Sequence, residues 1–155
     1  MPIKKFQITN ENLIFIQKKR RSFNYTRLFG PFICILLNLA FVNSFGLELI
    51  VSITLFSVLT ILTTAFCIVL PKKAINKLDK LVTSFEIGND LIDFQSLNEK
   101  TSIPKQNVIT RNTVIKIINK DHVVNEIVYD GKVYHIVMDY FQTEIGDFID
   151  ILKQK

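Results

Sequence analysis

The apolar residues of this chain are concentrated in one block, residues 28–70, in which Glu48 is the only charged side chain. A helix that crosses a bilayer needs about 20 apolar residues, and the block is about twice that long. The segment 42–48, VNSFGLE, interrupts it with the Asn, Ser and Gly that are typical of turns. The pattern therefore predicts a hairpin of two transmembrane helices, at residues 24–42 and 47–70.

Two prolines are expected near the ends of these helices. Pro31 falls in the first turns of the first helix, where a missing N–H is tolerated, and Pro71 is expected to end the second. The polar turn places Glu48 beside the membrane surface, where a carboxylate stays solvated. The alternative is a buried hairpin inside a soluble α+β protein, but the rest of the 155-residue chain is too short to cover the block.

Short apolar runs before the block flank a turn signal. Phe6 and Ile8 precede the sequence TNEN at residues 9–12, and the β-rich run LIFI follows at residues 13–16. We therefore expect residues 1–23 to form a cytoplasmic β-hairpin arm. A lone hairpin is marginally stable in water, so this arm is expected to dock on the other cytoplasmic segment.

After the block, the pattern changes to strands. The sequence KKAINKLDKL at residues 72–81 is spaced as a short amphipathic helix, or it is a solvated connector that continues the second helix. Several β-rich runs then follow one another through residue 141. The dipeptide Asp130-Gly131 between two of them favours a type I′ hairpin. Residues 143–153 combine a capping Thr with one apolar stripe, which predicts an amphipathic helix.

These elements predict an α+β membrane protein. A two-helix transmembrane hairpin is followed by a small cytoplasmic domain, residues 71–155. We expect this domain to be an antiparallel meander of five or six strands, with the C-terminal helix packed on the open side or end of the sheet.

The net charge of +5 adds an orientation, because basic residues flank the apolar block and none lies in its turn. Cytoplasmic flanks of membrane helices are enriched in Lys and Arg, so both flanks and both termini are expected in the cytoplasm. Abundant Lys, Ile and Asn hint at an AT-rich bacterial genome, and the expected location is the bacterial inner (plasma) membrane. The basic collar that would contact membrane lipids comprises Lys18, Lys19, Arg20, Arg21, Lys72 and Lys73.

Polar and small residues mark one face of the predicted hairpin. Asn38 lies near the middle of the first helix, at the depth of Ser57 and Thr60 in the second, and Thr64 continues that face. Residues of this kind let membrane helices approach and hydrogen-bond. Two interpretations stay open, which are packing within the hairpin and a face for a homo-oligomer or a protein partner.

The chain resembles a known family of bacterial membrane proteins. The stretch FQITNENLIFIQKKRR resembles the opening strands of bacterial pleckstrin-homology-like (PH-like) membrane proteins. The segments SIPKQNVI, TVIKIINKDHVVNEIVYDGKVYHIV and EIGDFIDILKQK resemble the C-terminal part of YcxB-like proteins. The resemblance implies a PH-like fold and a membrane-proximal binding or regulatory role, and it brings no catalytic residues.

Residues suited to catalysis or metal binding are scattered. His122 and His135 lie on neighbouring predicted strands without enough further ligands for a metal. Cys34 and Cys67 both lie in the apolar block and are interpreted as small apolar side chains. The sequence contains no Gly-rich phosphate loop, no nucleophile elbow and no aromatic–basic pattern for nucleic acid. We therefore expect no enzymatic activity, no cofactor and no nucleic-acid partner.

The leading hypothesis for function is a non-enzymatic inner-membrane protein whose cytoplasmic PH-like domain binds a protein or lipid headgroups, in a regulatory or scaffolding role. A second hypothesis is an immunity protein against a membrane-acting toxin, or an accessory subunit of a larger membrane complex. A third, ion or solute transport, requires the polar residues around Asn38 to line a path in an oligomer.

Overall fold

A computed structural model describes residues 4–117 and 120–141. The chain divides into two compact units. The helical unit comprises residues 18–75, and the β unit comprises residues 1–17 together with 76–155. The predicted helix at 143–153 lies outside the described residues.

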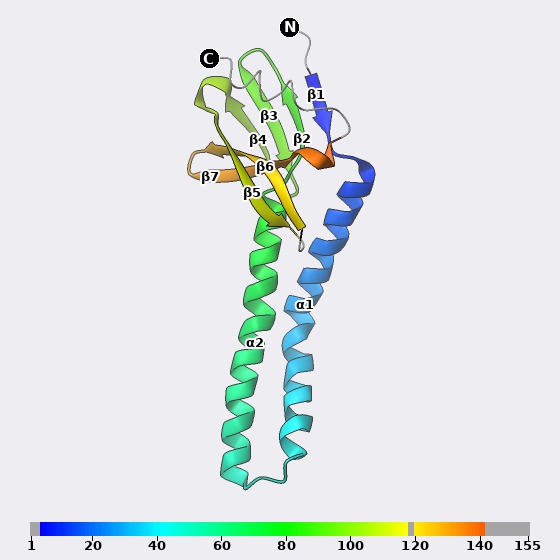
Figure 1. The fold of residues 1–155 in the computed structure, drawn as a ribbon, viewed down its shortest axis with the longest axis vertical. Coiled ribbons are helices and arrows are strands. Elements are labelled where there is room, and N and C mark those ends of the chain that lie inside the picture. The colour runs from blue at the N-terminus through cyan, green and yellow to red at the C-terminus, as the bar shows by residue number, and fades with distance from the viewer. Residues whose placement is uncertain (1–3, 118–119, 142–155) are drawn as a thin grey trace. The chain divides into compact units, whose positions relative to one another are not determined.

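The helical unit contains most of two long antiparallel helices, α1 (Asn10–Asn43) and α2 (Leu49–Asp79), which Figure 1 shows side by side. Both are long and apolar enough to cross a membrane. The predicted turn between them is confirmed. Gly46 has φ 57°, which is the left-handed conformation that favours glycine, and Glu48 precedes α2, where its carbonyl oxygen accepts a hydrogen bond from the N–H of Ser52.

The prediction of a β-hairpin arm at residues 1–23 is wrong in its second half. Within residues 4–23, the only strand is β1 (Lys4–Gln7), and α1 begins at Asn10. The oxygen of the Thr9 side chain accepts a hydrogen bond from the N–H of Asn12 at 3.3 Å, so TNEN is a helix cap rather than a turn between strands. Ile16 is 1% exposed whereas Ile14 is 63% exposed, which is the one-sided burial of a helix.

The prediction that Pro71 ends the second helix is also wrong. α2 continues through Pro71 to Asp79. Of the two expectations for residues 72–81, a separate amphipathic helix and a connector that continues the second helix, the structure agrees with the continuation. A proline inside a helix removes one backbone hydrogen bond, which a long helix tolerates, and Ile75 and Leu78 beyond it are buried. The prediction that Pro31 falls in the first turns of its helix is wrong as well, because α1 begins at Asn10 rather than at residue 24 and Pro31 lies in its interior.

The described residues of the β unit form two antiparallel sheets, where a single meander was predicted. The first has the order β1-β2-β3-β4 and the second the order β5-β6-β7. Their remaining bounds are β2 Val82–Ile87, β3 Leu91–Ser96, β4 Lys100–Pro104, β5 Ile109–Ile117, β6 Lys120–Tyr129 and β7 Lys132–Val137. Strand β1 precedes both helices in the chain and still pairs with β2, which follows them.

The Asp130-Gly131 hairpin is confirmed. Tyr129 and Lys132 form the last pair between β6 and β7, and the two residues between them have φ 47° and 71°. Two consecutive positive φ angles define the type I′ turn, and its twist suits the flanking strands.

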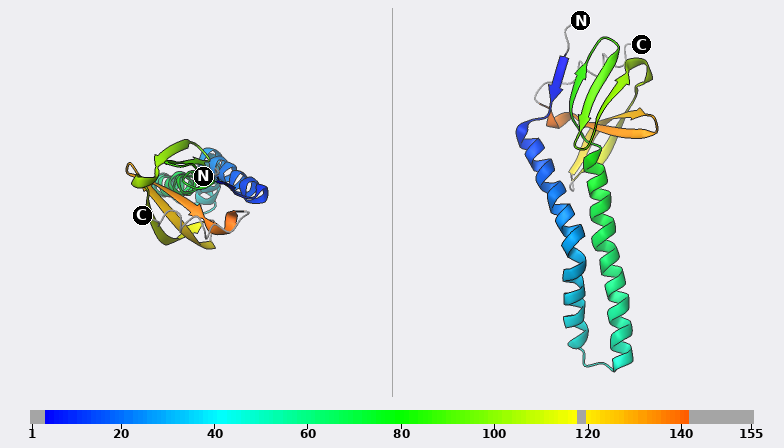
Figure 2. Two further views of the ribbon diagram at one scale, coloured as in Figure 1. Left: turned by 90° about the horizontal axis from the view of Figure 1, so that it is seen from above. Right: turned by 180° about the vertical axis from the view of Figure 1, so that it is seen from behind.

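The core of the β unit lies between the two sheets. Phe85, Phe94 and Ile103 from the first sheet are buried, as are Val124 and Ile136 from the second. Figures 1 and 2 show β7, in orange, crossing the direction of the strands in the first sheet.

Specific contacts join the two sheets. The rings of Phe94 and Tyr134 meet edge to face with centroids 4.5 Å apart. Backbone contacts add to this ring contact. The N–H of His135 in β7 donates to the carbonyl of Lys80, just before β2, and Ile8, just after β1, forms a bridge with Phe141. The two sheets are therefore linked both through their core and along one edge.

Candidate functional site

The polar face predicted for the hairpin is present in part. The side-chain amide of Asn38 donates to the hydroxyl oxygens of Thr60 at 3.4 Å and of Thr63 at 3.0 Å. Asn38 and Thr60 were predicted to meet, whereas Thr63 was missed. The signal for Thr63 was its position three residues after Thr60 and four before Cys67, which keeps it on the face that turns towards α1.

The other two residues of that predicted face behave differently. Ser57 is exposed, and its hydroxyl donates to the carbonyl of Ile53 in its own helix. The hydroxyl oxygen of Thr64 is buried without a hydrogen-bond partner. The cluster of Asn38, Thr60 and Thr63 therefore holds the two helices together, and Ser57 takes no part in it.

The basic collar lies within the helices rather than in loops beside them. Lys18, Lys19, Arg20 and Arg21 belong to α1, and Lys72 and Lys73 belong to α2. Four of these side chains are exposed, Lys18, Arg21, Lys72 and Lys73, and the other two are half-buried. Each helix thus passes from an apolar segment into a basic one without a break.

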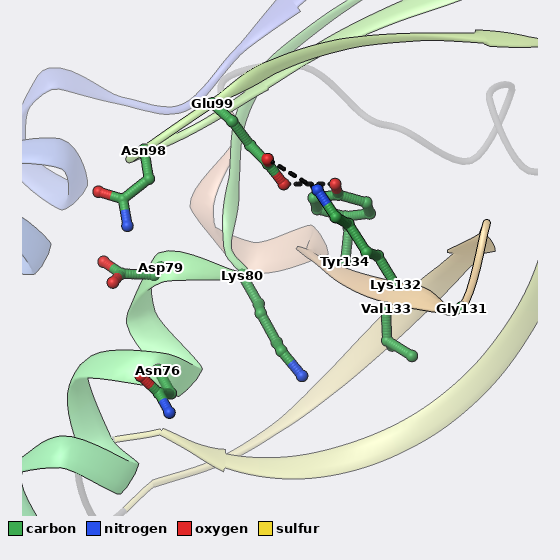
Figure 3. Close-up of a pocket in the computed structure, with 9 residues that line it drawn as sticks. All are labelled: Asn76, Asp79, Lys80, Asn98, Glu99, Gly131, Lys132, Val133 and Tyr134. Atoms are coloured by element: carbon green, nitrogen blue, oxygen red, sulfur yellow. Dashed lines mark hydrogen bonds and ion pairs between the residues drawn. The ribbon is translucent and has the colours of Figure 1, made fainter.

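A charged cleft in the β unit was not predicted. Its volume is about 430 Å³. It is lined by residues from the end of α2, the β3–β4 turn and the β6–β7 hairpin, which Figure 3 shows as sticks: Asn76, Asp79, Lys80, Asn98, Glu99, Gly131, Lys132, Val133 and Tyr134. In Figure 3 the side chain of Lys80 extends into the space between α2 and β7.

Three residues of this charged cleft form a hydrogen-bonded group. The Glu99 carboxylate accepts hydrogen bonds from the hydroxyl of Tyr134 and from the ammonium of Lys132, the latter at 3.1 Å. Lys132 and Tyr134 lie two residues apart on β7, so they share one face of the strand. Glu99 comes from the distant β3–β4 turn, and for this reason sequence reasoning missed the group.

The contacts within this group also shift the pKa values of its three side chains. The hydrogen bond from Tyr134, followed by that from Lys132, lowers the pKa of Glu99. The bond to Glu99 raises the pKa of Lys132, and burial together with the bond to Glu99 raises the pKa of Tyr134. At neutral pH the group therefore holds an ionised carboxylate, an ammonium and a neutral phenol, which is an arrangement for binding polar groups rather than for proton transfer.

A second cavity, of about 330 Å³, lies between the first turns of α1 and the second sheet. Its lining includes Phe15, His122 and Tyr140. The Tyr140 hydroxyl and Nε2 of His122 are 3.3 Å apart, and Nδ1 of His122 lies 3.6 Å from a carboxylate oxygen of Asp139. Burial, followed by the charge of Asp139, raises the pKa of Tyr140, so this phenol stays protonated at neutral pH.

The second histidine, His135, lies elsewhere, opposite Glu126 in the β6–β7 pair. Its Nδ1 is 3.5 Å from a Glu126 oxygen, and burial lowers its pKa. Within residues 4–117 and 120–141, no group of three His, Cys, Asp or Glu side chains is placed to hold a metal ion.

Comparison of this chain with protein-family models, with curated proteins and with solved structures finds no match.

Proposed function

We propose that this protein is a non-enzymatic integral membrane protein whose β unit is a PH-like domain that binds a protein partner or lipid headgroups. The exposure of the helices carries the membrane part of this proposal. In the most apolar 18-residue segment of each helix, 11% is buried in α1 and 0% is buried in α2. Apolar surface of this extent is stable when lipid covers it.

Strand pairing in the β unit supports an orientation with both ends of the hairpin on one side. Strand β1 lies before α1, strand β2 lies after α2, and the two pair residue by residue, with Phe6 opposite Phe85. Two strands that share backbone hydrogen bonds must occupy the same compartment. The basic residues next to both ends favour the cytoplasm, and the proposed location is the inner membrane of a bacterium.

The two-sheet architecture supports the PH-like assignment. A PH-like domain is a partly open barrel of two antiparallel sheets, and the β unit has sheets of four and three strands packed around one core. This arrangement agrees with the YcxB-like resemblance of the sequence, which implies the same fold.

The charged cleft is the proposed binding surface. It presents the ammonium groups of Lys80 and Lys132, the carboxylates of Asp79 and Glu99, and two Asn side chains, in a space large enough for a few side chains or one headgroup. Three of its residues follow the basic pair Lys72–Lys73 closely in the chain, which favours a ligand near the membrane surface.

Reporters at the two ends of the full chain test the membrane part. Fusions that are active only in the cytoplasm should be active at both termini, and carbonate washing should leave the protein in the membrane fraction. Opposite results at the two ends, or release by carbonate, would contradict the proposal.

A photo-crosslinking amino acid placed at Val133 in the charged cleft tests the binding part. We expect an adduct with a protein or a phospholipid in intact cells, identified by mass spectrometry. The matched control is the same amino acid at Val114, which is 64% exposed and lies outside the cleft. Equal labelling at both positions, or none at Val133, argues against the cleft. A toxin as the adduct would instead support the immunity hypothesis.

A further inference from the structure

The two cysteines of the chain face one another across the hairpin. Cys34 lies on α1 and Cys67 on α2, and their sulfur atoms are 3.4 Å apart. The chain has only these two cysteines, and both are half-buried between the helices. The proposed binding role of the β unit uses neither of them.

A glycine makes room for this approach. A Cβ atom at Gly30 would lie 3.2 Å from both the Cβ and the sulfur of Cys67, closer than side chains normally pack. Gly30 is four residues before Cys34, so both lie on the same face of α1. The absence of a side chain at Gly30 therefore lets Cys67 come close to α1 at the level of Cys34.

The polar cluster fixes the register of the helices next to the sulfur pair. Asn38 lies one turn after Cys34, and Thr63 lies one turn before Cys67. The hydrogen bond between Asn38 and Thr63 resists sliding of one helix along the other. The two sulfur atoms are therefore held near one another, 3.4 Å apart compared with about 2.05 Å in a disulfide.

We propose that Cys34 and Cys67 are a dithiol that oxidises to an intramolecular disulfide linking α1 and α2. In this step both S–H bonds break and one S–S bond forms. The two electrons and two protons pass to a lipid-soluble quinone, which becomes the quinol. The product closes a covalent loop around the turn between the helices and prevents them from separating.

The choice of oxidant rests on the proposed membrane location. Both cysteines lie inside the apolar segments of the helices, beyond the basic residues Arg27 and Lys72. In a bilayer, an apolar quinone reaches this depth, whereas a charged, water-soluble disulfide such as oxidised glutathione does not. The sulfur pair itself depends only on the packing of the two helices.

The experiment uses the full chain in liposomes, treated with a fully substituted benzoquinone, whose ring has no C–H position at which a thiol could form a stable adduct. After denaturation, maleimide should label both cysteines before treatment and neither afterwards, and dithiothreitol should restore labelling. Because uncatalysed disulfide chemistry is slow, the loss is expected over minutes to hours. Two treatments are compared, the quinone in liposomes and copper-phenanthroline in detergent. If maleimide still labels both cysteines fully after each of them, the sulfur pairing is overturned.

Variants with displaced thiols provide the control. Cys34→Ser should keep the one remaining thiol open to maleimide. The double variant Cys34→Ser/Ile35→Cys moves a thiol to an exposed neighbouring position, and its intramolecular link should form at least tenfold more slowly. Equal rates for this variant and the natural chain would contradict a specific pair.

Oxidised glutathione separates this inference from the proposed function. If it links the cysteines in liposomes as fast as the quinone does, the thiols are open to water, and the membrane location and the quinone assignment fail while the pair stands. If neither oxidant nor copper-phenanthroline links them, the pair fails while the membrane location is unaffected.

Discussion

Asn38 is the residue that most directly joins the two helices, since its amide donates to two hydroxyl groups of α2. Replacing it in Asn38→Leu keeps the size of the side chain and removes both bonds. Hydrogen bonds between membrane helices contribute about 0.6–2 kcal/mol, so we expect the free energy of helix separation to fall by about 1 kcal/mol. Steric trapping or denaturant titration in micelles measures this change.

Ser57 supplies the matched control for Asn38. It is another polar residue of the predicted face, but it bonds within its own helix. Ser57→Ala should leave the separation free energy within error of the natural chain. A loss equal to that of Asn38→Leu would show that the polar contacts between the helices are not those described.

Glu99 makes the stability of the folded chain depend on pH. Because its pKa is lowered in the folded chain, its contacts with Tyr134 and Lys132 add stability at neutral pH. This stability is lost as the pH falls from about 4.3, the ordinary value for Glu, through the lowered value. The effect is small, since the ion pair is exposed to solvent.

NMR titration of the Glu99 carboxyl carbon should show a midpoint below about 4.3, the ordinary value for Glu. Tyr134→Phe should move this midpoint upward, because it removes the largest cause of the shift. An unchanged midpoint in that variant would contradict the hydrogen bond.

Contacts between the two helices were predicted better than contacts between the turns and strands of the β unit. Asn38 and Thr60 could be matched because equal depth in two antiparallel helices follows from counting. The group of Glu99, Lys132 and Tyr134 could not, because it depends on how the β3–β4 turn meets β7.

Among the elements, α1 shows how a strong β pattern can mislead. The run LIFI has the branched and aromatic residues of a strand, yet it lies within a helix that starts at Asn10. Burial of Ile16 and the cap at Thr9 outweigh local β preference, which is weak and depends on context. The type I′ hairpin was predictable because Asp-Gly specifies its own backbone conformation.

Thr9→Ala tests the role of the helix cap. Loss of its side-chain bond to the N–H of Asn12 should destabilise the first turns of α1 by about 1 kcal/mol. Hydrogen exchange of amides 11–14 should become faster, while exchange in β6 stays unchanged. Thr9→Ser retains the hydroxyl and should behave as the natural chain.

At the scale of the whole molecule, the β unit is built from two parts of the chain, β1 before the two helices and β2 to β7 after them. Residues 1–17 joined by a Gly/Ser linker to residues 76–155 should therefore fold without the helical unit. We expect a water-soluble product with a β-type circular dichroism spectrum and cooperative unfolding.

The matched control for this fusion is residues 76–155 alone. That fragment lacks β1 and the buried residues Phe6, Ile8 and Ile16, and it should be less stable or aggregate. Equal stability of the two products would mean that the N-terminal segment is not part of the β unit.

The position of β1 also bears on how the protein is made. During synthesis β1 leaves the ribosome first, and its partner β2 follows only after both helices. With both helices in the bilayer as proposed, failure of one helix to insert would leave the two strands on opposite faces and the first sheet incomplete. In that arrangement, completion of the sheet would mark a correctly inserted chain, because a wrongly threaded one would keep β1 and β2 unpaired.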